Sequence, residues 1–279
     1  MRNLITTMAI ISLAACGGKD DETGDTSVVT DDTSVVTDDT GTTGTVVDAS
    51  FSLSGNAIDM QFMTPVSSGA LCMTIADPTE AIAGGDLIVL TQTTIEADTG
   101  AWATDVFETD SVVGLFMIVS DCDGLTTVVF PTATGFNSYA DAGDGEDIGG
   151  LTSISISMLA AGGMNQSFAA AGSSMTLAAN GAMAGFVFDA DGATPVSGAT
   201  VCGADCADTL YFDTAMADGL FTTQGAVNME TDASAMGAFV VPGASVYTYV
   251  VDDGGAHNWD SLLFGAVPGM VSFVSFIAN

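Results

Sequence analysis

Residues 185–203 read GFVFDADGATPVSGATVCG, two runs of β-forming residues on either side of a turn. The runs at 184–189 and 199–202 predict two short strands, because aromatic and β-branched side chains suit a pleated, half-buried surface. Between them, Gly192 permits a tight turn and Pro195 is suited to the start of an edge strand. This stretch therefore predicts a strand, a turn and a second strand.

The same pattern recurs along most of the chain. Further segments rich in β-formers, each bounded by Gly, Asp or Asn, cover 51–60, 70–75, 87–94, 112–120, 126–130, 151–158, 238–241, 246–252 and 271–277. Short strands with frequent turns favour a β-sandwich over a helical or α/β fold. The Ala-rich stretch 159–182 has a helical composition, but its glycines weaken a helix, so we interpret it as a connection between domains.

The two halves of the body resemble each other. Residues 55–72 and 185–202 align without a gap and share seven identities over eighteen positions, where composition alone gives about one or two. The step Gly100-Ala101-Trp102 matches Gly237-Ala238-Phe239, and the strand ending at Asp121 matches the one ending at Asp252. We therefore predict an all-β protein with two tandem domains at 49–158 and 183–279, joined by 159–182.

The second copy resembles the carboxypeptidase regulatory-like family over about residues 183–252. The residues that carry this resemblance are Gly185, Val187, Asp189, Gly192, Pro195, Val196, Gly198, Ala199 and Val201, and then Thr231, Asp232, Gly237, Phe239, Pro242, Gly243 and Tyr247. The resemblance implies a transthyretin-like, Greek-key sandwich of seven strands. The matching residues are scaffold in that family, and none is catalytic. For the first copy, the assignment rests mainly on the internal repeat.

The N-terminus has the pattern of an export signal. Residues 1–15, MRNLITTMAIISLAA, combine one basic residue, a short apolar stretch and small residues before Cys16, as in a secretory signal peptide. The segment Leu13-Ala14-Ala15-Cys16 resembles the lipobox of bacterial lipoproteins, in which the cysteine carries the lipid. Gly17 follows, where an Asp in that family favours the inner membrane. We expect a protein attached to the outer membrane through Cys16.

Residues 16–48 are rich in Thr and Asp and contain a perfect tandem repeat, TSVVTDD at 26–32 and at 33–39. Two copies of seven residues cannot form a solenoid or bury a face. We interpret the segment as an extended, disordered and self-repelling tether between the membrane and the body. Glycosylation of its threonines is an alternative that the sequence leaves open.

The charge is almost entirely negative, with 35 Asp and Glu against two Lys and Arg, for a formal net charge of −33. The two cations are Arg2 and Lys19, so residues 20–279 contain neither Lys nor Arg. Nucleic acid and anionic lipid are therefore excluded as partners, since both need clustered cations. Hydrophobic residues make up 48% of the chain, which predicts a folded body held by apolar burial and backbone ladders rather than by salt bridges.

Four cysteines remain once Cys16 is assigned to the lipid. An even number in an exported protein predicts disulfides, and we pair Cys72 with Cys122 and Cys202 with Cys206. By sequence alignment, the position equivalent to Cys122 in the second copy is Asp253, so Cys202 needs another partner. A zinc site with four thiolates is the alternative, which the ligand spacing and the oxidising compartment disfavour.

Three sets of residues are candidates for ligand binding, metal binding or catalysis. His257 and Trp259 are predicted to form a loop that folds back on the sandwich, with a stacking edge for a sugar or peptide as the alternative. Asp141, Asp144, Glu146 and Asp147 suggest calcium, although they fit no EF-hand loop and also suit a solvated turn. Asp98-Thr99-Gly100 spells the aspartic-protease triplet, but the residues before it, Glu96-Ala97, do not bury a carboxylate, so Asp98 is predicted in a hairpin turn.

These observations predict a non-enzymatic, lipid-anchored envelope protein with a structural or adhesion role and no required cofactor. The sequence contains one histidine and no G-x-S-x-G motif, and neither supports a hydrolytic triad. A surface module that binds carbohydrate or peptide is the alternative, and a hydrolase with paired carboxylates is a further one. The partner on the cell surface, glycan or protein, is not specified by the sequence.

Overall fold

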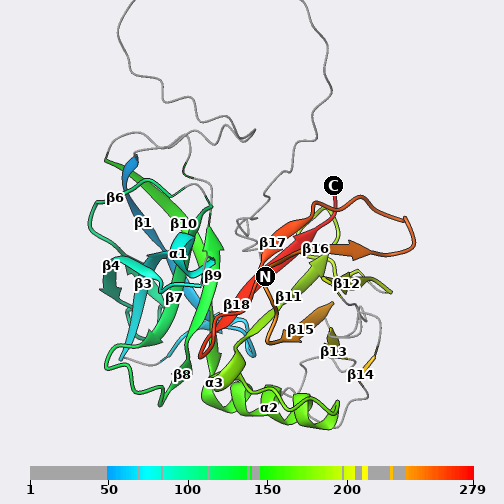
Figure 1. The fold of residues 1–279 in the computed structure, drawn as a ribbon. Coiled ribbons are helices and arrows are strands. Elements are labelled where there is room, and N and C mark those ends of the chain that lie inside the picture. Colours follow the sequence, from blue (N-terminus) through cyan, green and yellow to red (C-terminus); the bar gives the residue numbers. More distant parts are fainter. Residues whose placement is uncertain are drawn as a thin grey trace, which may run out of the picture.

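The structure is a computed structural model that describes residues 49–279, apart from 68–69, 83, 112, 137–138, 140–144, 197, 205–208, 213–226 and 229–236. The signal peptide and tether predicted at 1–48 lie outside the described residues. The described chain consists mostly of strands arranged in several sheets, as predicted for a β-sandwich protein (Figure 1). None of its described helices has the length and hydropathy needed to span a bilayer.

The first half of the body runs from residue 49 to residue 157. Its elements are β1 (Ala49–Asp59), β2 (Thr64–Pro65), β3 (Leu71–Asp77), α1 (Thr79–Ile82), β4 (Ile88–Thr94), β5 (Ala101–Ala103), β6 (Phe107–Thr109), β7 (Leu115–Asp121), β8 (Val129–Phe130), β9 (Thr132–Phe136) and β10 (Glu146–Ser157). Six segments predicted as strands are confirmed here, whereas β2, β5, β6 and β9 were not predicted.

Two helices, α2 (Met158–Ala170) and α3 (Leu177–Asn180), lead into the second half. Its strands are β11 (Ala182–Phe188), β12 (Thr200–Cys202), β13 (Leu210–Phe212), β14 (Val227–Asn228), β15 (Ala238–Pro242), β16 (Tyr247–Asp252), β17 (Leu262–Phe264) and β18 (Val271–Ile277). The five segments predicted as strands in this half are confirmed. The short β13, β14 and β17 were not predicted.

Each half packs two sheets face to face. In the first half, β1 pairs with β2, β5, β6 and β10, and this sheet faces the ladder β9-β7-β3-β4 across a core that includes Phe51, Met73 and Phe136. In the second half, the ladder β14-β13-β15-β11-β18 faces the small sheet β12-β16-β17 across a core that includes Phe239 and Phe276. Both cores are apolar, as expected for sandwiches whose inner faces interdigitate.

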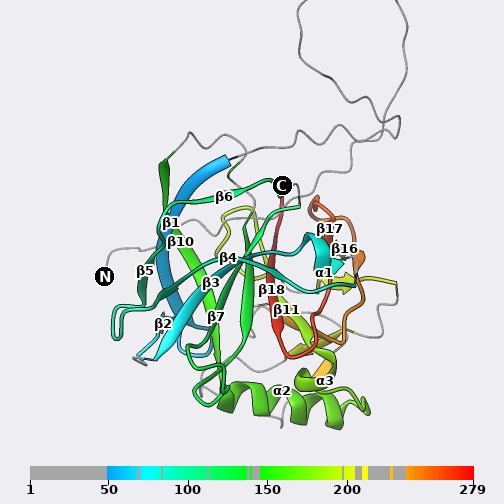
Figure 2. The same ribbon diagram turned by 60° about the vertical axis from the view of Figure 1, so that its left-hand side comes forward.

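A single parallel ladder joins the two halves. β18, the last strand of the chain, pairs with β9, and Val271, Ser272 and Phe273 lie opposite residues 132–134. This pairing merges two ladders into one sheet of nine strands, in the order β14-β13-β15-β11-β18-β9-β7-β3-β4. Figures 1 and 2 show β18 in the middle of the molecule, between the strands of the two halves. The halves are therefore joined through backbone hydrogen bonds as well as through the chain.

The connection predicted at 159–182 folds mostly as helix. Ser157 caps α2 with its hydroxyl, which accepts a hydrogen bond from the Ala160 N–H at 3.2 Å. The helix buries Ala160, Met164 and Phe168 in a third apolar core, against β10 and the outer faces of β11, β15 and β18. Two internal glycines argue against a helix here, but this tertiary packing outweighs their low propensity.

Because the third core lies on one face of the sheet and the sandwich core lies on the other, β11 is buried along its whole length. Its first aromatic, Phe186, packs in the third core, while its neighbour Val187 packs in the core of the second half. Successive side chains of a strand point to opposite faces, so a strand between two cores must be apolar at every position. This explains the continuous apolar run AMAGFVF.

The two copies of the internal repeat make equivalent contacts. Gly55 on β1 lies opposite Leu151 of the parallel strand β10, and Gly185 on β11 lies opposite Val274 of the parallel strand β18. At each glycine an added Cβ would meet the carbonyl oxygen of that partner, at 2.2 Å from Leu151 and at 1.8 Å from Val274. Only glycine therefore fits this position in either half.

The later glycines of the repeat are equivalent as well. The Ala57 N–H donates to the Gly100 carbonyl at 2.7 Å, and the Val187 N–H donates to the Gly237 carbonyl at 3.2 Å. Both glycines have a φ of +66°, in the left-handed region that favours glycine. The ladder register also corrects the alignment by one residue, because it makes Asp252, not Asp253, the equivalent of Cys122.

We predict that Gly185→Ala lowers the free energy of unfolding by about 2 kcal/mol or more, because its Cβ overlaps backbone that cannot move without breaking the β11–β18 ladder. Gly162→Ala is the matched control. This glycine lies in α2, where its added Cβ would meet no atom within 4 Å beyond the neighbouring helix backbone, so alanine there should raise stability by about 0.5–1 kcal/mol. Urea unfolding of both variants checks this, and equal stability of the two would contradict it.

Candidate functional site

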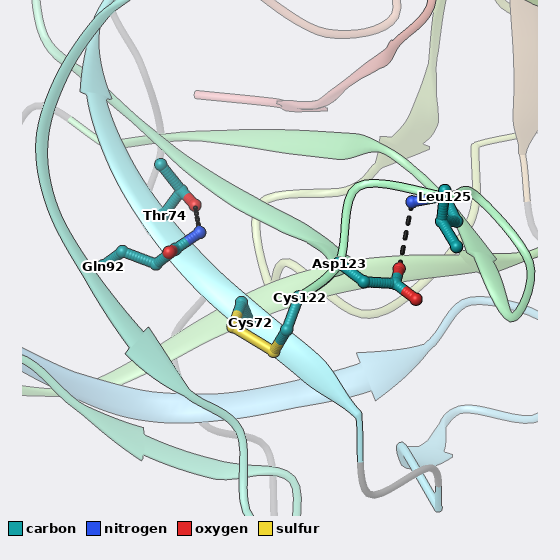
Figure 3. Close-up of a disulfide and its surroundings, with 6 residues drawn as sticks. All are labelled: Cys72, Thr74, Gln92, Cys122, Asp123 and Leu125. Carbon is teal, nitrogen blue, oxygen red and sulfur yellow. Dashed lines mark hydrogen bonds between the residues drawn. A yellow bond between two sulfur atoms is a disulfide. The ribbon is translucent and has the colours of Figure 1, made fainter.

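The disulfide predicted in the first half is present. Cys72 lies on β3 opposite Ser120 of β7, and Cys122 follows the end of β7, so the antiparallel ladder brings the two cysteines together with a Cα–Cα distance of 4.9 Å. The Cys122 N–H also donates to the Ala70 carbonyl at 2.9 Å. Figure 3 shows this bridge between the start of β3 and the residue after β7, which confirms the pairing Cys72–Cys122.

Of the other three cysteines, Cys202 lies among the described residues. Cys202, at the end of β12, is disulfide-bonded. Its predicted partner Cys206 and the predicted lipidation site Cys16 lie outside the described residues. The pairing of Cys202 with Cys206 and the lipid on Cys16 therefore stay predictions.

A buried carboxylate beside the disulfide holds the loop between β7 and β8. Asp121 accepts hydrogen bonds from the backbone N–H groups of residues 127, 128 and 129 and from the Thr127 hydroxyl. Burial raises the pKa of the Asp121 carboxyl, but these hydrogen bonds to its charged form outweigh burial, so its pKa is lowered overall. The loop thus depends on an ionised aspartate.

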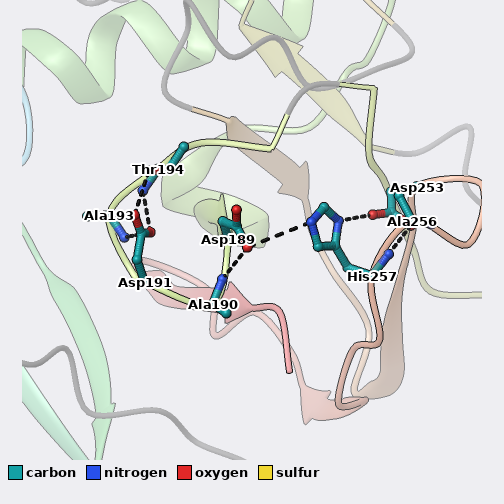
Figure 4. Close-up of polar contacts among 8 residues, drawn as sticks. All are labelled: Asp189, Ala190, Asp191, Ala193, Thr194, Asp253, Ala256 and His257. Atoms are coloured by element: carbon teal, nitrogen blue, oxygen red, sulfur yellow. Dashed lines mark hydrogen bonds and ion pairs between the residues drawn. The ribbon is translucent and has the colours of Figure 1, made fainter.

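His257, the one histidine of the chain, lies between two carboxylates (Figure 4). Its Nδ1 is 2.5 Å from Oδ2 of Asp253, four residues earlier in the loop between β16 and β17. Its Nε2 is 3.7 Å from Oδ1 of Asp189, which directly follows β11. Burial raises the pKa of the Asp253 carboxyl, and hydrogen bonds from the His257 side chain and from the backbone of residues 256 and 257 outweigh it, so this pKa is lowered overall.

This arrangement ties two loops together rather than assembling a catalytic group. Both ring nitrogens of His257 face carboxylates, so neither is directed at a hydroxyl or thiol nucleophile. The loop that carries Asp189 is itself fixed by Gly192, with a φ of +66°, and by Asp191, which accepts from the Thr194 hydroxyl at 2.6 Å. His257 therefore links the β11–β12 loop to the β16–β17 loop.

Trp259 folds back on the sandwich, as predicted. It forms an isolated bridge with Ala278, is partly buried against the core of the second half and lies edge-on to the His257 ring at 5.8 Å between centroids. Its indole nitrogen is buried. A ring held inward in this way supports a structural role, and the stacking edge for a sugar or peptide stays a prediction.

Two of the four residues predicted to bind calcium lie among the described residues. Asp141 and Asp144 lie outside the described residues, whereas Glu146 and Asp147 begin β10. The Asp147 carboxylate accepts hydrogen bonds from the Ser54 hydroxyl at 3.2 and 3.3 Å. Within the described ranges, no group of three or more His, Cys, Asp or Glu side chains is placed to hold a metal ion. Calcium at this loop stays a prediction.

The triplet resembling an aspartic protease lies in a turn. Asp98 has a φ of +69° between β4 and β5, and the Gly100 N–H closes the turn by donating to the Glu96 carbonyl at 2.9 Å. The Thr99 hydroxyl donates to the Glu96 carboxylate at 2.7 Å. The prediction of a turn for Asp98 is confirmed, but β4 pairs with β3 and β5 pairs with β1, so this turn connects two sheets and does not close a β-hairpin.

An apolar groove between the two halves was not predicted. Its empty volume, including the open mouth, is about 560 Å³. It is lined by Pro78, Ala81, Ile82, Val113 and Phe116 from the first half, and by Val246, Leu263, Phe264, Gly265, Ala266 and Val267 from the second. The signal in the sequence is the run Leu262-Leu263-Phe264: a short strand with alternating faces must expose its middle residue, and Leu263 is 37% exposed.

The groove is a concave, apolar surface, which is the usual character of a binding site. Its lining includes Phe116 and Phe264, whose ring centroids are 6.2 Å apart, and Ile82, which is 39% exposed on α1. No lining residue is charged or has a polar side chain. The groove therefore suits an apolar side chain better than a sugar, whose hydroxyls need polar partners.

Comparison with known proteins gives no family assignment. No family model matches the chain, and no curated protein matches it. Among solved structures, the shaft pilin SpaA from Lactobacillus rhamnosus GG is 9% identical with a TM-score of 0.21, over 84% of this chain and 98% of that one. A Streptococcal ancillary pilin is 9% identical with a TM-score of 0.22, over 83% of this chain and 69% of that one.

A 9R-lipoxygenase from Cyanothece is 13% identical with a TM-score of 0.24, over 43% of this chain and 18% of that one. Similarities this low carry no argument about fold or activity. The resemblance of residues 183–252 to the carboxypeptidase regulatory-like family therefore stays a prediction based on the residues quoted above.

We predict that the protein loses stability in acid through Asp121 and Asp253. Their pKa values are lowered in the folded state, so their contribution is present at neutral pH and is lost as the pH falls below about 3.9, the value in an unfolded chain. Asp121→Asn should cost about 1–3 kcal/mol at pH 7 and flatten the acid dependence.

Asp123→Asn is the matched control, because this exposed neighbour accepts only one hydrogen bond from the Leu125 N–H, at 3.0 Å (Figure 3). Urea unfolding between pH 3 and pH 7 measures both variants. Equal losses of stability for Asp121→Asn and Asp123→Asn would show that the loop does not depend on the buried carboxylate.

Proposed function

We propose that the protein is an exported lipoprotein, held at the outer membrane through Cys16, that presents its body on an acidic tether as a non-enzymatic adhesion or interaction module. The apolar groove between the halves is the observation that supports the interaction role most directly, since it is an exposed, preformed concave surface. The lipobox at 13–16 and the repeat at 26–39 support the anchor and the tether.

The finer fold assignment is part of this proposal. The two halves are duplicated transthyretin-like domains at 49–158 and 183–279, and residues 159–182 connect them. The equivalent glycines Gly55 and Gly185, each opposite a parallel strand, support the duplication. The small sheet β12-β16-β17 corresponds to the ladder β3-β7-β9 in register, with a constant offset of 130 residues.

Peptide binding is favoured over carbohydrate binding as the form of this interaction. The groove offers only apolar side chains, and no charged or amide side chain is present to orient a sugar. A catalytic role has less support, because His257 engages carboxylates through both ring nitrogens. Hydrolysis of a glycan or peptide by the purified protein would overturn the non-enzymatic part of the proposal.

The anchor is tested by Cys16→Ser, which removes the thiol that accepts the lipid. We expect loss of lipid labelling and release of folded protein from the membrane fraction. Gly17→Asp is the matched variant: it keeps the thiol, so labelling should remain while the protein moves to the inner-membrane fraction. Membrane attachment of Cys16→Ser would overturn the proposal.

A further inference from the structure

We propose that the groove beside β17 binds an extended, cationic and apolar peptide segment of a partner protein as an added β-strand. This inference rests on the interaction role proposed above and names the class of partner. It follows from three observations: the open edge of β17, the way the equivalent edge is paired in the first half, and the apolar groove that borders the edge.

β17 is the last strand of its sheet in the part of the chain that the structure describes. The sheet order is β12-β16-β17, and Tyr247 and Tyr249 of β16 lie opposite Phe264 and Leu262. The Ala266 N–H donates to the Ala244 carbonyl at 2.8 Å, on the side of β16. Backbone groups alternate in direction along a strand, so the intervening Leu263 and Gly265 direct theirs away from β16, toward the open edge.

The first half shows what this edge accepts. β9 is the equivalent of β17, because Thr132 lies opposite Val119 just as Leu262 lies opposite Tyr249. The outer edge of β9 is not open, since β18 pairs with it in parallel and the Val271 N–H donates to the Pro131 carbonyl at 2.9 Å. The same edge of the sandwich thus already accepts an added strand within this chain.

The groove lies beside the open edge, where an added strand would continue the sheet. Leu263 and Gly265 supply the backbone edge, and Ile82 of α1 stands on the side that belongs to the first half. A strand in this position would direct every second side chain toward Phe116 and Phe264. Strand addition combines main-chain hydrogen bonds along an edge with a pocket for alternate side chains, and β17 offers such an edge beside an apolar groove.

The negative charge of the chain indicates which side chains the bound peptide should carry on the face directed away from the groove. Residues 20–279 contain no Lys or Arg. Glu80 directly precedes the lining residue Ala81 on α1, Asp260 lies three residues before the lining residue Leu263, and both carboxylates are exposed. A partner segment with acidic residues would be repelled, whereas Lys or Arg at alternate positions would be attracted. The best ligand therefore alternates apolar and cationic residues.

A second copy of this chain is a poor occupant. Its donor strand would be β10, the equivalent of β18, at residues 148–150. There β10 is interrupted by a bulge, with a φ of +76° at Gly150, and it begins with Glu146 and Asp147. Bulges and charges are features that block pairing at sheet edges. Two chains that each carry a net charge of −33 also repel each other.

The probe is a synthetic peptide, acetyl-KVKFKVKFK-amide with a fluorophore, titrated into the full mature protein at 0.15 M salt. We expect saturable binding that is lost when alternate backbone nitrogens of the peptide are methylated, because methylation removes donors without changing charge or side chains. The peptide EVEFEVEFE should not bind. Binding of the methylated peptide as tightly as the parent, or no binding of the parent, would overturn the proposal.

Two variants locate the site. Ile82→Lys places a cation on the groove wall and should weaken binding about tenfold or more. Val89→Lys is the matched control, since it makes the same charge change at a position that is 62% exposed on β4 and is absent from the groove lining. Both positions are exposed, so both variants should fold, as far-UV circular dichroism checks.

Equal weakening by the two lysine variants would mean that the peptide binds through net charge alone, and would overturn the proposed site. Sedimentation velocity tests whether a second copy of the chain occupies the groove. A dimer that is lost in Ile82→Lys would show that the occupant is a second copy and would overturn the proposed partner segment. Neither result affects the anchor, because lipid labelling and release of Cys16→Ser depend on the N-terminus only. Failure of this inference and failure of the proposed function are thus distinguishable.

Discussion

The parallel pairing of β18 with β9 is the interaction on which the arrangement of the body depends. Residues 271–273 lie opposite residues 132–134 and merge ladders from both halves into one sheet. Ion pairs cannot hold the two halves together, because no Lys or Arg follows Lys19. His257 is the cationic side chain that pairs with carboxylates in the described chain. A third apolar core, in which Met164 and Phe168 of α2 pack on the same sheet, supports the pairing from one face.

The same pairing creates the candidate site. By occupying the outer edge of β9, β18 brings the small sheet of the second half against α1 and β7 of the first, with Phe116 and Phe264 in contact across the boundary. The two sandwiches differ at the outer edges of β9 and β17, among other places. The edge that is filled in the first half has no partner strand in the second among the described residues, and it lies beside an apolar groove. The proposed binding role follows from this difference between the edges of β9 and β17.

Much of the fold was predictable because it depends on local patterns. Alternating β-formers located eleven strands, and the repeated glycines located equivalent positions in the two halves, since Gly55 and Gly185 each face a carbonyl oxygen of the neighbouring parallel strand. The pairing Cys72–Cys122 followed from strand order. The β9–β18 junction was not predictable, because alternation identifies a strand but not the neighbour at its edge. The helix α2 and the groove were missed for related reasons: distant packing outweighed Gly162 and Gly163, and the groove forms only when the two halves meet.

The central claim is that the two halves share one sheet and therefore unfold together. The chain has one tryptophan in each half, Trp102 on β5 and Trp259 after β16, so Trp259→Phe reports on the first half and Trp102→Phe on the second. The most direct measurement is urea unfolding of both variants with their disulfides intact, followed by fluorescence and far-UV circular dichroism. We expect the fluorescence and circular dichroism transitions to coincide within each variant. A tryptophan whose transition is separate from the circular dichroism of the same protein would contradict the account.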